Sequence, residues 1–170
     1  MRRLGHATLA MLALLPLALA ADPAAADDTV QWKDIVGIVQ AKNVVGAGLG
    51  QVTGGAQPWT TAGGLANVDL ATGQVHFVVK GLVFAGGNAV GRPGAVTEVK
   101  GTLLCDTDGS AAPDTQVVDT ALVPLSSRGD AEFTGPVGPI PGVCFSEPDI
   151  AFLIRTGGGA WIANGAILSR

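Results

Sequence analysis

His76 has the side chain best suited to acid–base chemistry in this sequence, because histidine titrates near neutral pH. A hydrolytic triad would need a nucleophile beside it, and the candidate hydroxyls belong to Ser126, Ser127 and Ser146. None of these serines lies in a G-x-S-x-G segment. His76 also shares its predicted strand face with Lys80, which favours a solvated histidine. We therefore assign no catalytic residue.

Aspartates at alternate positions in a predicted turn suggest a cation site. Asp106 and Asp108 precede Gly109, and Asp114 lies close enough in the sequence to add a third carboxylate. Carboxylate oxygens suit calcium, but the glycine comes too early for an EF-hand loop and no glutamate closes it. We expect an ordinary Asp-Gly turn and no cofactor. A calcium-binding module that uses Asp106, Asp108 and Asp114 is an alternative.

Carboxylates alone could support a hydrolase of the glycosidase type, which uses two acids about 5 to 10 Å apart. Glu98, Glu132 and Glu147 join the aspartates as candidates, yet no spacing singles out a pair. A carboxylate-dependent hydrolase is therefore the competing function. Zinc is disfavoured, because His76 is the only histidine beyond residues 1–26, and one histidine with two oxidised cysteines cannot supply its usual ligands.

Tryptophan can stack on a ligand or fill a core. Trp161 alternates with apolar Ala163 and Ile167, which predicts a core position. Trp59 follows Pro58 in a glycine-rich segment that we expect to be a loop. Because functional contacts concentrate on loops, Trp59 is the predicted ligand contact.

The elements that must position these residues show apolar side chains at every second position. Val75, Phe77 and Val79 point to one face and His76, Val78 and Lys80 to the other, which is typical of a half-buried strand. Residues 65–70 alternate in the same way, and Gly73 supplies a tight turn between the two segments. The sequence therefore predicts a hairpin here.

The same pattern recurs further along the chain. It predicts a strand over residues 96–105, a hairpin joining 121–125 to 131–134, and a last hairpin joining 150–154 to 161–167. Residues 35–41 and 44–52 are weaker strand candidates. Glycine and proline interrupt nearly every window of helix length. We expect an all-β fold, a single-domain β-sandwich or flattened barrel of about 7 to 9 mostly antiparallel strands. The loop over 136–142 is interpreted as a crossing between sheets.

Cys105 ends one predicted strand, and Cys144 follows a proline-rich loop. In an oxidising compartment a disulfide between them is the default. A redox-active pair would favour a C-x-x-C spacing, which is absent.

The first residues indicate export. Arg2 and Arg3 precede an apolar run over residues 9–20, which is interrupted by Pro16 and is too short to span a bilayer. Small residues allow cleavage after Ala20 or Ala26, so residues 1–26 are predicted to be a signal peptide with a short leader and 27–170 the domain. We expect a secreted or periplasmic protein without a transmembrane anchor after cleavage.

Net charge limits the partners. The chain carries a formal charge of −4, and beyond residues 1–26 its basic residues are scattered singly, so nothing there neutralises a run of phosphates. We expect no nucleic-acid partner. The predicted function is that of an exported, non-enzymatic module with a binding role or a structural role in the cell envelope or outside the cell.

Overall fold

The computed structural model describes residues 28–146 and 148–169. The predicted signal peptide lies outside these residues. The described elements follow one another along the chain as β1 (Thr29–Gly37), β2 (Val44–Val45), η1 (Gly48–Gly50), β3 (Val52–Thr53), β4 (Trp59–Thr60), β5 (Gly63–Asp69), β6 (Gln74–Lys80), β7 (Val83–Phe84), β8 (Glu98–Cys105), β9 (Gln116–Asp119), β10 (Val123–Pro124), β11 (Ala131–Pro136), α1 (Val143–Ser146), β12 (Ile150–Thr156) and β13 (Trp161–Ser169).

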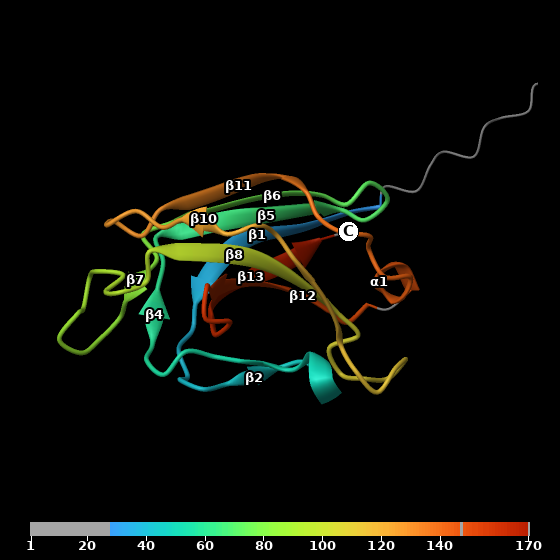
Figure 1. Cartoon of the computed structure of the whole chain (residues 1–170), viewed down its shortest axis with the longest axis horizontal. Coiled ribbons are helices and arrows are strands. Elements are labelled where there is room, and N and C mark those ends of the chain that lie inside the picture. The colour runs from blue at the N-terminus through green and yellow to red at the C-terminus, as the bar shows by residue number, and fades with distance from the viewer. Residues whose placement is uncertain (1–27, 147, 170) are drawn as a thin grey trace, which may run out of the picture.

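One antiparallel sheet dominates the fold, in the order β10-β8-β12-β13-β1-β5-β6-β11, with β9 also paired to β8. The sheet curls until its two ends, β10 and β11, lie next to each other (Figure 1). At that junction the Ser126 N–H donates to the Asp130 carbonyl over 2.9 Å. The predicted all-β class is confirmed. A single curled sheet has the form of the flattened barrel and not of a two-sheet sandwich.

The interior of the curled sheet is filled by aromatic rings. Trp32 of β1 and Phe77 of β6 both pack against Phe152 of β12, with ring centroids 5.5 and 5.9 Å away. Gly101 of β8 makes room for them, because a Cβ there would lie 2.5 Å from the Phe152 ring. These residues come from distant parts of the chain, so the core forms only when the sheet has closed.

Two predicted hairpins are confirmed. β5 pairs with β6 around the turn at Gly73, and β12 pairs with β13. The predicted hairpin between β10 and β11 is wrong in its pairing, because β10 pairs with β8 and β11 pairs with β6. The loop that was expected to cross between sheets instead leads from β11 to α1.

Small elements close the rest of the molecule. The hairpin of β2 and β3 packs against β13, where the Gly55 N–H donates to the Trp161 carbonyl over 2.8 Å and the Trp161 indole donates to the Asn43 carbonyl over 3.0 Å. Neighbouring residues Leu103 and Leu104 of β8 are both buried. Because they point to opposite faces, this part of the sheet is covered on both sides. The pair of β4 and β7 lies at one end of the molecule's long axis, and α1 lies at the other end (Figure 1).

Candidate functional site: a cleft at one end of the sheet

The structure places His76 on the outer face of β6, as predicted. Its side chain is 38% exposed, and its Nε2 lies 3.7 Å from Glu132 Oε1 on the neighbouring strand β11. Two of the three candidate serines are engaged elsewhere. Ser126 Oγ accepts the N–H groups of Arg128 and Asp130, and Ser146 Oγ donates to the Val143 carbonyl. The described residues therefore bring no serine into hydrogen-bond contact with His76.

Asp106 is buried directly after β8 and organises the loop that follows. Its carboxylate accepts the N–H of Ala111 over 3.1 Å and that of Ala112 over 2.7 Å. Burial alone would raise the pKa of Asp106, but these backbone donors outweigh it and hold the pKa below its ordinary value. The Asp106 carbonyl in turn accepts the Thr115 hydroxyl, which ties both ends of the loop together.

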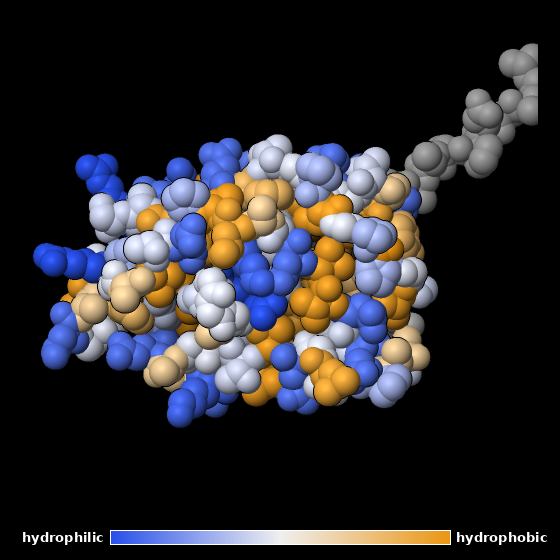
Figure 2. All heavy atoms as spheres, in the orientation of Figure 1, coloured by the Kyte–Doolittle hydropathy of each residue, from blue (hydrophilic) through white to orange (hydrophobic). Residues whose placement is uncertain are grey.

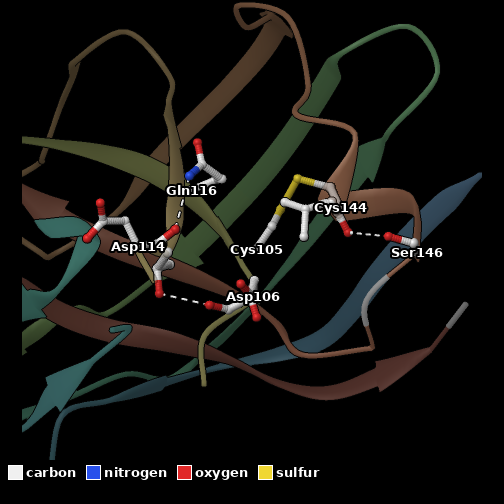
Figure 3. Close-up of a disulfide and its surroundings, with 8 residues drawn as sticks. Cys105, Asp106, Asp114, Gln116, Cys144 and Ser146 are labelled. Atoms are coloured by element: carbon white, nitrogen blue, oxygen red, sulfur yellow. Dashed lines mark hydrogen bonds between the residues drawn. A yellow bond between two sulfur atoms is a disulfide. The ribbon is translucent and has the colours of Figure 1, made fainter. Parts of the chain in front are cut away.

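The other two aspartates of the predicted calcium site hold backbone groups of their own. Asp108 accepts the Ser110 N–H, and Asp114 accepts the Leu49 N–H from η1 over 2.7 Å. Figure 3 shows Asp106 next to the cysteine pair and Asp114 further along the loop. Within residues 28–146 and 148–169, no three His, Cys, Asp or Glu side chains gather in a group that could hold a metal ion. The structure thus assigns these carboxylates a role in the loop.

Cys105 and Cys144 are both buried and lie at disulfide distance, with sulfur atoms 2.07 Å apart (Figure 3). The bond joins the end of β8 to α1. The predicted pairing of these two residues is therefore present in the structure, and it anchors the segment that follows β11.

A charged network lies on the outer face of β8, β9 and β12. Asp119 accepts from Lys100, from Arg155 Nη1 over 3.2 Å and from the Thr102 hydroxyl over 2.6 Å. Partial burial would raise the pKa of Asp119, but hydrogen bonds from Lys100 and Thr102 and the charge of Arg155 lower it overall. Figure 2 shows hydrophilic atoms gathered over the middle of this face, with hydrophobic atoms beside them. With its carboxylate saturated by three donors, Asp119 holds strands together and is poorly placed to act as a base.

Trp59 is not the exposed loop residue that the sequence predicted. It lies in β4, is only 3% exposed, and packs against Phe84 of β7 with ring centroids 4.2 Å apart. Proline and glycine around it suggested a loop, but a two-residue strand pairing with β7 places its ring in the core. Trp59 is also among the residues that line a smaller cleft of about 340 Å³, together with Asp34 and Thr61, so its role as a ligand contact stays a prediction.

A cleft of about 510 Å³ lies beyond the end of the sheet, and one of its lining residues, Gly94, packs against the Phe84 ring. Its walls are the connection between β7 and β8 and the turn after β10. We call it the end cleft, and it is lined by Asn88, Ala89, Arg92, Pro93, Gly94, Val96, Thr97, Leu125 and Ser127. Its volume falls within the range of about 300 to 1,000 Å³ that is typical of small-molecule sites.

Both walls of the end cleft are anchored. Phe84 donates its N–H to the Arg92 carbonyl and accepts the Gly91 N–H, over 3.1 and 3.0 Å. Gly94 adopts a φ of +64° and approaches the Phe84 ring so closely that a Cβ would lie 2.7 Å from it. On the opposite wall the Leu125 N–H donates to the Thr97 carbonyl over 2.8 Å. The cleft is therefore formed before any ligand arrives.

Sequence reasoning missed the end cleft because none of its residues belongs to a known motif. One signal was present. The thirteen residues between β7 and β8 contain four glycines and a proline, and connections this long without secondary structure are uncommon unless they are functional. Periodicity identifies strands, so it overlooks a site whose residues come mainly from such a connection.

Three further clefts are smaller, with volumes of about 340, 320 and 290 Å³. The first contains Asp34, the second Glu98, and the third no carboxylate. None of these clefts combines two acids, which is the arrangement that a glycosidase requires.

No protein-family model, curated protein or solved structure matches this chain. Among the described residues, no helix is long and apolar enough to cross a membrane. The site must therefore be interpreted from its own chemistry.

Proposed function

We propose that this chain is an exported, non-enzymatic binding module and that the end cleft is its binding site. The observation that carries the proposal is the composition of the cleft. Of its nine lining residues, four have apolar side chains, namely Ala89, Pro93, Val96 and Leu125, Gly94 contributes only backbone, and the other four offer polar groups. A mostly apolar bed with a few placed polar groups is the usual make-up of a small-ligand site.

Export is supported by the basic and apolar pattern of the first 26 residues and by the buried cysteine pair. Disulfides persist in oxidising compartments outside the cytosol and are rare within it. A periplasmic or secreted location suits both features.

The absence of an enzymatic role is supported by where the reactive side chains lie. His76 is on an outer sheet face, Asp106 is buried under its own loop, and Asp119 is saturated by donors. None of them lines the end cleft. The competing hydrolase would need two carboxylates facing one cleft.

A fragment screen observed by NMR on the domain tests this proposal. Ser127→Trp should fill the end cleft and abolish fragment binding, because Ser127 is an exposed lining residue. Ala71→Trp is the matched control, since Ala71 is also exposed but lies in the turn between β5 and β6, away from β7 (Figure 1). Binding that survives Ser127→Trp, or a screen without any bound fragment, would contradict the proposal.

A further inference from the structure

We infer that the end cleft selects small molecules that carry one carboxylate on an apolar body, and that Arg92 binds the carboxylate. This inference rests on the proposed function and specifies its ligand. It follows from the charge of the cleft, from the shape of its apolar bed and from the way the backbone fixes Arg92.

Charge is the first argument. Arg92 lines the cleft and forms no ion pair with any described residue, whereas Lys100 and Arg155 are both paired with Asp119. The lining contains no acidic residue, so nothing in the cleft neutralises the guanidinium. An arginine matches a carboxylate with two parallel hydrogen bonds, which makes that group its preferred small partner.

The remaining polar groups of the cleft are neutral. Asn88, Thr97 and Ser127 offer an amide and two hydroxyls, and no hydrogen bond to another described residue occupies these side chains. They can donate hydrogen bonds to the carboxylate lone pairs that Arg92 leaves free, or to a hydroxyl group on the ligand. They add no charge, so Arg92 sets the sign that the cleft prefers.

The apolar bed defines the other half of the ligand. Leu125 is only 7% exposed, Pro93 is buried and Val96 is half-buried, so their hydrocarbon surfaces form a firm floor. Covering such a floor with an alkyl chain contributes about 0.8 kcal/mol for each buried CH₂ group. A ligand with a short hydrocarbon body uses this surface, and a fully polar ligand leaves it in contact with water.

The backbone of Arg92 is held in place, although its side chain is exposed. Its N–H donates to the Ala89 carbonyl over 3.1 Å, and its carbonyl accepts the Phe84 N–H. Pro93 follows directly and restricts the backbone of the residue before it. The guanidinium therefore starts from a fixed point at the rim, which lowers the entropic cost of binding.

One acid lies nearby and limits the charge of the ligand. Glu98 follows Thr97 in the sequence and lines the adjoining cleft, which shares Val96 and Thr97 with the end cleft. Its charge is exposed, and exposed charges interact over about 8 Å at physiological salt. A second carboxylate on the ligand meets this repulsion, so monocarboxylates are preferred over dicarboxylates.

The test uses three probes with the same hydrocarbon chain, namely hexanoate, hexan-1-ol and hexylamine, titrated into the 15N-labelled domain. Hexanoate should bind most tightly and hexylamine least. Arg92→Ala should weaken hexanoate about ten- to a hundredfold and leave hexan-1-ol unchanged, because the loss is that of hydrogen bonds to a charged group. Arg92→Lys should retain part of the preference. Arg128→Ala, an exposed arginine outside the lining, should change nothing.

Equal affinity for hexanoate and hexan-1-ol, an unchanged affinity in Arg92→Ala, or no binding of hexanoate would overturn the inference. Ser127→Trp separates this failure from failure of the proposed function. If that variant abolishes binding of the alcohol, the end cleft remains a binding site without carboxylate selectivity. If it affects none of the probes that bind, the cleft is not the site and both proposals fail.

Discussion

The indole of Trp59 packs against the ring of Phe84 with centroids 4.2 Å apart and planes inclined by 42°. Gly94 meets the same Phe84 ring, so this aromatic pair connects the core to the floor of the end cleft. The two residues are adjacent only because β4 pairs with β7, with Trp59 directly opposite Phe84.

Replacing the larger ring tests this connection. Trp59→Ala should lower the free energy of unfolding by about 3 to 5 kcal/mol, the usual cost of removing a buried tryptophan. Urea unfolding measures the loss. Hydrogen exchange should also become faster at Phe84 and Gly91, because the Phe84 N–H donates to the Arg92 carbonyl and the Gly91 N–H donates to the Phe84 carbonyl. Trp59→Phe provides a milder variant, and unchanged exchange in the connection between β7 and β8 would argue against its support by this pair.

The cysteine pair should contribute strongly to stability. Cys105→Ala combined with Cys144→Ala should cost about 2 to 5 kcal/mol, which is typical for a native disulfide in a small secreted domain. Substituting both residues avoids a free thiol in the core. Titration of the native, non-reduced protein should detect no reactive thiol, and two thiols would contradict the bond.

The Asp119 network should make stability depend on pH. Because the pKa of this carboxyl is lowered in the folded protein, its contribution is complete above the ordinary aspartate pKa and disappears as pH falls through the lowered value. Asp119→Asn should therefore cost about 1 to 2 kcal/mol at neutral pH and very little in strong acid, since partial exposure screens the charges. Urea unfolding at several pH values measures this difference. Glu98→Gln is the control, an exposed carboxylate without an ion pair among the described residues.

Calcium should produce little change in melting temperature. The carboxylates of Asp106, Asp108 and Asp114 already accept backbone N–H groups, so a cation would have to displace those bonds. A true site saturated at about 100 times its dissociation constant would add about 2.7 kcal/mol. A melting temperature that rises with calcium, falls with chelator and no longer responds in Asp108→Ala would show that the metal binds here.

Local pattern determined which parts of the fold were predictable. Val75, Phe77 and Val79 occupy every second position of β6 and are buried there, and the hairpins with short turns were found from the same alternation. The strand predicted to start at Ile35 starts at Thr29 in the structure. The prediction missed its first residues because the alternation of buried residues in β1 shifts by one position between Trp32 and Ile35. A break of this kind hides a strand from any test of strict periodicity.

The site was less predictable than the fold, because it depends on contacts between distant segments. Trp59 looked like a loop residue until β7 supplied its pairing partner, and Leu125 reaches the end cleft only because its N–H bonds to Thr97. Neither contact can be predicted from the residues next to it in the sequence. Cys105 and Cys144 were predictable because two cysteines allow a single pairing.

The bond between Cys105 and Cys144 spans 39 residues and encloses β9, β10 and β11 in one covalent ring. The turn after β10, with exposed Arg128, lies inside that ring. A trypsin cut there would leave both halves of the chain linked, so the nicked protein would migrate as one species until the disulfide is reduced. The wall of the end cleft that carries Leu125 and Ser127 would thus remain attached to the sheet after proteolysis.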